Sequence, residues 1–141
     1  MPAEAMANYS RSLQIKPDSA EAYMSLGIAF NESKQYDRAI AHFIASMSIR
    51  PDFAARAHKH LGYALFLAGR LAQSAKEYQE YLKAHPDDAQ IHNDLGVVFA
   101  RSGNLDRAIK HFRQALRTKP DLAEAKKHLG NVLSLQKQLN S

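Results

Sequence analysis

A Pro-Asp pair recurs along this chain at a near-constant interval, and that period constrains the fold more than any other feature. Successive pairs are 34, 35 and 34 residues apart, at Pro17-Asp18, Pro51-Asp52, Pro86-Asp87 and Pro120-Asp121. A Leu-Gly pair recurs between them at intervals of 35, 34 and 34, at Leu26-Gly27, Leu61-Gly62, Leu95-Gly96 and Leu129-Gly130. A fixed period of this length is typical of stacked small units, none of which can bury a core alone.

Each unit is predicted to be a pair of helices. In the first unit, apolar and small residues fall at offsets of three, four and seven, the spacing of one helical face, at Tyr23, Leu26, Gly27 and Phe30. A second amphipathic run covers residues 36–49, and Pro51 prevents its continuation. The same design returns in residues 55–88 and 89–122, so we expect helical hairpins throughout.

The helix ends carry their own signals. Each Asp after the Pro is expected to cap the next helix, and three of them precede Glu or Gln by three residues, as in a capping box: Asp18, Asp87 and Asp121. Gly69 and Gly103 lie where a first helix should end, which favours a left-handed turn, whereas the first unit has Lys34 there and is expected to turn differently. The glycine of each Leu-Gly pair costs about 1 kcal/mol relative to Ala in mid-helix. We therefore expect a neighbouring helix to pass too close for a side chain.

With these marks the chain resembles the tetratricopeptide repeat family. Its signature runs aromatic, Leu-Gly, aromatic, then Ala and an aromatic in the second helix, then Pro. The first unit supplies Tyr23, Leu26-Gly27, Phe30, Ala39, Phe43 and Pro51, and the third Leu95-Gly96, Phe99, Ala108, Phe112 and Pro120. The second unit departs more, with His58, Leu65, Ser74 and Tyr81 at signature places. The resemblance implies an all-α solenoid of helical hairpins, a right-handed superhelix of antiparallel helix pairs.

The predicted organisation is one array over residues 1–141. Complete repeats are expected at 20–53, 55–88 and 89–122, with the second helix of a partial repeat at 1–17 and the first helix of another at 123–141. By register, the tail is expected to run just past the turn of its hairpin. Three interpretations stay open: a solubilising cap, a segment of a longer array, and head-to-tail self-association in which the last helix packs on the first helix of the next molecule.

The resemblance also implies where a partner would bind. In this family the first helices of the repeats line a concave groove that holds a peptide or a partner helix. The groove residues expected here are Met24, Ile28, Arg56, Lys59, His60, Tyr63, Phe66, Asn93, Val97, Arg101, Lys127 and Asn131. Tyr63 and Phe66 are candidate apolar anchors, and the cations among the twelve are candidate contacts for acidic or carbonyl groups. The plainer interpretation is that Phe66 packs between helices and Tyr63 covers a gap.

One subfamily holds the acidic C-termini of heat-shock chaperones with a clamp of Lys, Asn and Arg. In one register the corresponding places are Met24, Ile28, His60, Gln90 and Asp94, and in the other they are Lys59, Tyr63, Asp94, Glu124 and His128. Neither set can hold a carboxylate in that manner. We expect no tight binding of such tails.

The formal charge of +5 is concentrated at one end. Residues 101–141 carry 9 Lys or Arg against 3 Asp or Glu, and 1–100 carry 10 against 11. Nucleic-acid binding is therefore an alternative function, through a basic cluster at Lys110, Arg113, Arg117, Lys119, Lys126 and Lys127. The signature residues are those of a protein-binding family, so nucleic acid is the less favoured partner, and a solvated helix face is the favoured interpretation of the cluster.

Nothing in the chain indicates catalysis. It has no Cys, none of its 7 His form a His-x-x-x-His pair, and no nucleophile elbow or phosphate-binding Gly loop occurs. We expect a non-catalytic protein-interaction scaffold without metal or cofactor. A regulatory or substrate-presenting segment of a larger enzyme is a further alternative. No secretory signal and no apolar run of membrane-spanning length occur, so a cytoplasmic location without a membrane span is expected.

Overall fold

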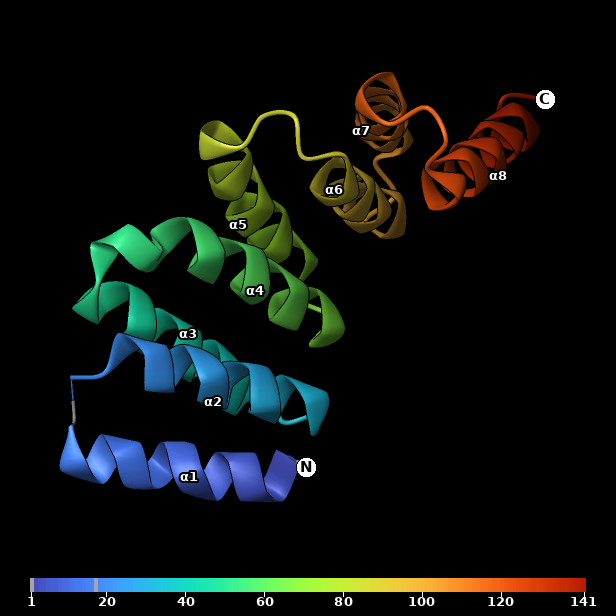
Figure 1. The fold of residues 1–141 in the computed structure, drawn as a ribbon. Coiled ribbons are helices and arrows are strands. Elements are labelled where there is room, and N and C mark those ends of the chain that lie inside the picture. The colour runs from blue at the N-terminus through green and yellow to red at the C-terminus, as the bar shows by residue number, and fades with distance from the viewer. Residues whose placement is uncertain (1, 17) are drawn as a thin grey trace. The chain divides into compact units, whose positions relative to one another are not determined.

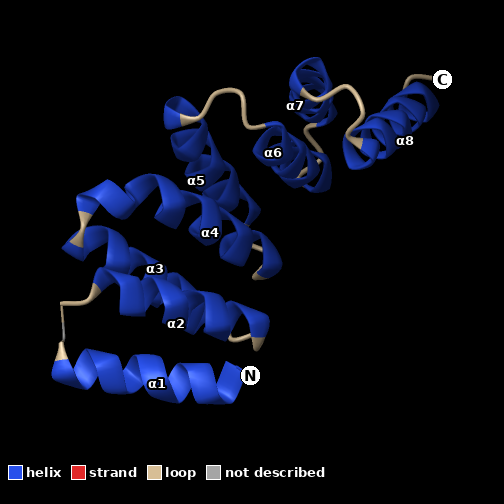
Figure 2. Ribbon diagram, in the orientation of Figure 1, coloured by secondary structure: helices blue, strands red, loops and turns tan. Residues whose placement is uncertain are grey.

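The computed structural model describes residues 2–16 and 18–141, with only the backbone for Pro2 and Ile15. The described residues form eight α-helices and one short 3-10 helix, and no strand occurs among them (Figure 2). The elements are α1 Pro2–Ile15, α2 Ala20–Glu32, α3 Tyr36–Ile49, η1 Pro51–Phe53, α4 Ala54–Leu67, α5 Leu71–Ala84, α6 Ala89–Arg101, α7 Leu105–Thr118 and α8 Ala123–Leu139. The predicted all-α architecture of a helical repeat is confirmed.

The helices group into two compact units, Met1–Glu77 and Tyr78–Ser141, whose boundary falls within α5. In the first unit α1, α2, α3 and α4 pack in chain order, each on the next (Figure 1). In the second unit α6 packs on α7 and α7 on α8. Each unit therefore has its own stack of neighbouring helices, as expected when a short repeat buries its apolar face against the next one.

Each of two internal hairpins is built around one phenylalanine. Phe43 of α3 and Phe112 of α7 are both 0% exposed, and each lies against the mid-helix glycine of the preceding helix. A Cβ atom on Gly27 would lie 2.5 Å from Cε1 of Phe43, and one on Gly96 would lie 2.5 Å from Cε1 of Phe112. The expected close approach is confirmed at these two glycines, because real Cβ atoms do not come so near another carbon. At Gly130 of α8 the expectation is wrong, since among the described residues no atom beyond the adjoining backbone of α8 lies within 4 Å of the Cβ position.

Two departures from the signature residues form hydrogen bonds. The Ser74 hydroxyl, where the signature has Ala, is buried and donates to the Gly62 carbonyl oxygen at 2.6 Å. The Tyr81 hydroxyl, where a small residue is usual, donates to Asp88 Oδ2 at 2.6 Å. Both polar groups are therefore satisfied, which removes the cost of burying them.

The predicted helix caps are wrong by one residue. The residue that caps α2 is Ser19, whose Oγ accepts from the Ala22 amide, and the cap of α6 is Asp88, whose Oδ1 accepts from the Ile91 amide at 3.2 Å. Leu122 stands at the same place before α8 and offers no side-chain bond. The helices begin one residue later than expected because Asp18, Asp87 and Asp121 belong to the connection that follows the Pro.

The turns inside the hairpins share one backbone conformation. Gly69 and Gly103 have φ of 80° and 82°, which confirms the predicted left-handed turns. Lys34 also has a positive φ, 63°, so the expectation of a different turn in the first hairpin is wrong. A residue with a Cβ pays about 1–2 kcal/mol for this conformation. The packing of α2 on α3 is strong enough to impose it.

The last helix does not turn at all. Gln136–Gln138 are at the register of Ser33–Gln35, where α2 ends, yet α8 continues to Leu139. The expected turn in the tail is therefore wrong, and α8 is 17 residues long where α2 and α6 are 13. In the part of the chain that the structure describes, no helix combines the length and the apolar character needed to cross a bilayer.

Candidate functional site

The most exposed large side chains of the first unit include an aromatic one on α4. Tyr63 is 49% exposed, and Arg56 and Lys59 precede it at helical spacings of seven and four, so that the three share one face. The guanidinium of Arg56 lies 5.3 Å from the ring centroid of buried Phe53. This contact with the ring restrains the position of Arg56. The face combines an apolar ring with two positive charges.

His60 lies one turn from Tyr63 and is only partly available. Its ring stacks on Phe43 with centroids 5.5 Å apart and an interplanar angle of 18°. Burial lowers the pKa of His60, and the nearby charges of Lys59 and Arg56 lower it further. At neutral pH the His60 ring is therefore uncharged, and it packs on Phe43 beside the exposed residues of α4.

The other candidates of the first unit differ in exposure. Ile28 of α2 and Phe66 of α4 are half-buried, with Ile28 packed against the core. Met24 is 2% exposed and belongs to the core, so its prediction as a groove contact is corrected: a bound chain cannot reach it. On the same stripe of α2, Oδ1 of Asn31 is covered and has no hydrogen-bond partner among the described residues.

In the second unit a polar network joins α6 to α8. Asn93 is 1% exposed, its Oδ1 accepts from His128 Nδ1 at 3.0 Å, and its Nδ2 donates to Glu124 Oε2 at 3.4 Å. The amide of Gln90 donates to Asp94 Oδ1 at 3.0 Å and to Glu124 Oε2 at 3.3 Å. Asn93 was predicted to contact a partner; it instead holds α6 and α8 together, which is a second correction.

Asp94 gives this network its electrostatic character. Burial raises the pKa of Asp94, and the charges of Glu124 and Asp88 raise it further, while hydrogen bonds from Gln90 and Asn93 act in the opposite direction. Val97 is half-buried beside it, and the remaining predicted candidates, Arg101, Lys127 and Asn131, are exposed. The side of α6 that carries Asp94 therefore presents an acidic group, in contrast to the face of α4, which presents cations.

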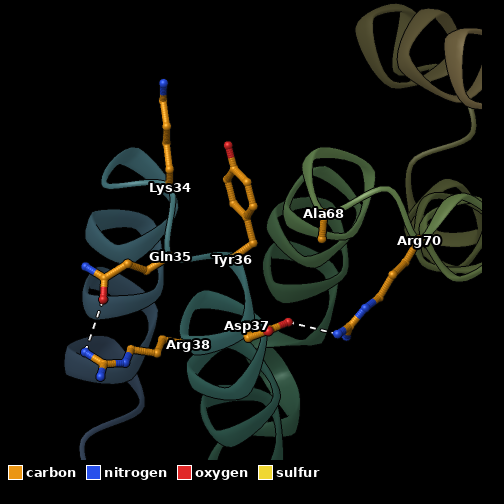
Figure 3. A pocket seen from close by; sticks show the side chains of 7 residues that line it. All are labelled: Lys34, Gln35, Tyr36, Asp37, Arg38, Ala68 and Arg70. Carbon is orange, nitrogen blue, oxygen red and sulfur yellow. Dashed lines mark hydrogen bonds and ion pairs between the residues drawn. The ribbon is translucent and has the colours of Figure 1, made fainter.

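A cleft of about 480 Å³ lies outside these faces in the first unit. Figure 3 shows its lining at the turn before α3 and the turn before α5, with Asp37 paired to Arg70 at 2.8 Å and Arg38 bonded to Gln35. Lys34, with its left-handed backbone, extends away from Asp37 and Arg70 in this view (Figure 3). The sequence contains no signal for this cleft, because it depends on how two turns far apart in the chain approach.

Three histidines of the second unit, His92, His111 and His128, lie between helices, whereas His85 is exposed in the α5–α6 connection. His92 donates from Nε2 to the Pro86 carbonyl oxygen at 2.7 Å, which confirms that it bonds a backbone group. His58 of the first unit instead bonds a carboxylate, Glu77, at 2.5 Å. The described residues contain no group of three or more His, Cys, Asp or Glu that could hold a metal ion.

The basic cluster of the second unit lies at the surface. Lys110, Arg113 and Arg117 of α7 line a cleft of about 350 Å³ together with Leu133 of α8. The other members, Lys119, Lys126 and Lys127, are exposed in the α7–α8 connection and on α8. The cluster thus lies mostly on a second helix of a hairpin and on a turn.

Solved structures with the same fold share little sequence with this chain. A crystal structure of MamA protein superposes with a TM-score of 0.83 over 92% of this chain and 70% of that one, at 21% identity. The crystal structure of YrrB, a TPR protein with an unusual peptide-binding site, superposes with a TM-score of 0.83 over 96% of this chain and 70% of that one, at 20% identity. One chain in the crystal structure of the APC/C hetero-tetramer Cut9-Hcn1 gives 0.83 over 89% and 25%, at 18% identity. Identities this low concern the fold alone.

Sequence comparison identifies the repeat itself. A curated relative, small glutamine-rich tetratricopeptide repeat-containing protein 2 of Mycosarcoma maydis, is 29% identical over 84 residues, or 60% of this chain. The match covers 24% of that relative, about a quarter of its length. The family model described as tetratricopeptide repeat matches residues 2–52, 48–89 and 61–123. The chain belongs to the tetratricopeptide repeat family.

Proposed function

We propose that this chain is a non-catalytic protein-interaction scaffold that binds an acidic peptide segment of a partner on the α4 face. That face is defined by Arg56, Lys59 and Tyr63. The exposed ring of Tyr63 is the observation that carries the proposal, because tyrosine is enriched among the residues that dominate binding energy at interfaces. YrrB, a TPR protein of the same fold with an unusual peptide-binding site, agrees with it.

The chemistry of the face selects the ligand. Arg56 and Lys59 are exposed and positively charged, and His60 beneath them is neutral, so a bound segment gains from carboxylates and main-chain carbonyl oxygens. The covered Oδ1 of Asn31 is an acceptor that costs about 1–3 kcal/mol while unsatisfied. The ligand proposed is thus an extended, acidic segment with one apolar anchor.

Display selection tests this directly. Short random peptides displayed on phage are selected on the purified chain, and the enriched sequences are synthesised and titrated by calorimetry. We expect enriched peptides to carry Asp or Glu beside an apolar residue, and Tyr63→Ala and Lys59→Glu each to weaken their affinity about tenfold or more. Ile44→Ala is the matched control, because Ile44 is 45% exposed on α3, away from the first helices of the repeats.

Two results would count against the proposal. One is a set of enriched peptides that bind Tyr63→Ala as tightly as the wild type, which would place the ligand elsewhere. The other is enrichment of basic peptides, which would favour the acidic side of α6 at Asp94. The expected cytoplasmic location stays a prediction from the sequence.

A further inference from the structure

The mid-helix glycine of α8 leaves a notch that is filled in the internal hairpins. At Gly27 and Gly96 the Cβ position is 2.5 Å from a phenylalanine ring of the following helix. At Gly130, the same register position, no atom of another helix or of a side chain in the described part of the chain lies within 4 Å of the Cβ position. The notch at Gly130 therefore has the backbone of an aromatic-binding position without the aromatic.

The neighbouring side chains of α8 are exposed in the same way. Phe99, the residue three after Gly96, is 7% exposed, whereas Leu133, three after Gly130, is 37% exposed. The cleft between α7 and α8 has Leu133 and the buried Ile109 in its lining, with Lys110, Arg113 and Arg117 around them. Figure 1 shows α8 packed along α7 within the second unit, with no helix of that unit on its other side. The notch and the cleft together form a seat for one more helix.

The rings in the internal hairpins show what this seat accepts. Phe43 lies between Gly27 and His60, whose ring centroid is 5.5 Å away, and Phe112 lies between Gly96 and His128 at the same distance. Each ring is thus held between its own hairpin partner and the next first helix. A helix that fits the Gly130 notch must carry an aromatic residue with small or apolar residues one turn to either side.

The first helix of this chain has that pattern. Tyr9 is eight residues before Pro17, as Phe43 is before Pro51 and Phe112 before Pro120. Around it stand Ala5, Met6 and Ser12, spaced like Ala39, Ile40 and Ser46 around Phe43. Those three residues of α3 are 0%, 8% and 0% exposed, while Ala5, Met6 and Tyr9 are only half-buried and Ser12 is exposed. The core face of α1 is thus covered on one side only.

Hydrogen bonding and charge support the same pairing. The Ser46 hydroxyl donates to the Ala20 carbonyl oxygen at 2.8 Å, and the corresponding pair is Ser12 and Ala123. The Ser12 hydroxyl now donates to the Asn8 carbonyl oxygen at 3.1 Å within α1, so it would exchange that bond for one to the second copy. Arg107 of α7 lies over the ring of Phe99 of α6, with its guanidinium carbon 5.5 Å from the ring centroid. In the proposed contact Glu4 of α1 corresponds to Arg107, and Leu133 of α8 corresponds to Phe99. Lys137 follows Leu133 by one turn. Glu4 on α1 and Lys137 on α8 would therefore attract each other where the two helices meet.

We propose that α8 of one molecule binds α1 of a second copy, with Tyr9 seated in the Gly130 notch, so that two copies complete one hairpin between them. The contact is heterologous, so it continues from copy to copy and forms open chains. The contact uses the face of α8 that carries Gly130 and Leu133, and not the α4 face. It is therefore independent of the peptide-binding proposal.

Sedimentation velocity of the full chain over a concentration series tests the association. We expect the average mass to rise from 15.8 kDa in dilute solution to several multiples of it at about 1 mM. Gly130→Leu fills the notch from within, and because no neighbour stands there it leaves the monomer folded. Asn131→Ala changes the next residue without filling the notch and should associate like the wild type. Leu133→Glu places a charge in the seat and should abolish the association.

A mixture of two variants tests the head-to-tail geometry. A Gly130→Leu copy offers only its α1, and a Tyr9→Ala copy offers only its α8, so each alone is expected to remain at 15.8 kDa. Mixed in equal amounts, they should form a species of twice that mass and nothing larger. Circular dichroism of each variant serves as the folding control, and both are expected to keep the helical content of the wild type. A wild type that stays monomeric at about 1 mM, association of either variant alone, or no complex in the mixture overturns the proposal.

Discussion

The Gly96→Leu variant is expected to lose about 3 kcal/mol of unfolding free energy. The first atom of the new side chain would lie 2.5, 2.7 and 3.0 Å from three carbons of the Phe112 ring. That ring cannot retreat easily, because it is completely buried and His128 of α8 lies against it. The substitution therefore either displaces α7 from α6 or forces the ring out of its rotamer.

The matched control for this variant is Gly130→Leu, since the two glycines occupy the same register position. With open space at its Cβ position, Gly130→Leu should lose nothing and gain up to about 1 kcal/mol from helix propensity. Urea unfolding followed by circular dichroism, at concentrations where both variants are monomeric, measures the difference. Equal stability of Gly96→Leu and the wild type would show that α6 and α7 do not pack as described.

The second large effect concerns His111 and acid. Burial lowers the pKa of His111 to about 4, and the charges of His92, Lys110 and Arg107 act in the same direction. Its ring stacks on Phe99 with centroids 5.5 Å apart, and its Nδ1 lies 3.1 Å from Nδ1 of His92. His92 Nε2 in turn donates to the Pro86 carbonyl oxygen at 2.7 Å, so the two rings are held in one hydrogen-bonded chain.

The sign of the pH effect follows from the protonation of His111 in the folded chain and in the unfolded chain. Above pH 6.5, the ordinary value, His111 is neutral in both the folded and unfolded chains, and its contribution to stability is fully present. Between pH 6.5 and about 4 the unfolded chain binds a proton that the folded chain refuses, so stability falls as the pH falls. Allowing for the partial exposure of the ring, the loss attributable to His111 is about 2 kcal/mol at pH 4.

Two measurements check the behaviour of His111. An NMR titration of its imidazole resonances should give a midpoint near 4, whereas a midpoint near 6.5 would show that the ring is not held in the apolar stack. His111→Gln removes the titrating group, so its stability relative to the wild type should improve by about 2 kcal/mol between pH 7 and pH 4. Parallel stability curves for the two proteins would contradict the assignment.

Much of the fold could be predicted because its determinants are local and repeated. The spacing of Tyr23, Gly27 and Phe30 defines a helical face, and Gly69 and Gly103 mark turns that require a left-handed residue. The register of helix starts was harder. Ser19 and Asp88 cap their helices, one residue after each Pro-Asp pair. Because Ser and Asp are both common capping residues and each follows an Asp, the sequence alone does not separate the two helix starts.

The candidate surfaces could be predicted only in part. The spacing of Arg56, Lys59 and Tyr63 placed them on one face correctly, because helical geometry alone decides that. Met24 and Asn93 were predicted to be accessible but are buried, since their exposure depends on how closely the next first helix approaches. The bonds of Asn93 to Glu124 and His128 join residues 31 and 35 positions apart, and no local signal announces them.

The positive φ of Lys34 bears on how the chain folds as well as on what it folds into. Before folding, a glycine samples the left-handed region about as readily as the right-handed one, whereas a lysine visits it rarely. Closure of the α2–α3 hairpin therefore requires a backbone conformation that Lys34 rarely adopts in the unfolded chain. The hairpins that turn at Gly69 and Gly103 have no such requirement. In a stack where order can spread from any starting point, nucleation should favour the two glycine turns, and the Lys34 turn should be the last to form.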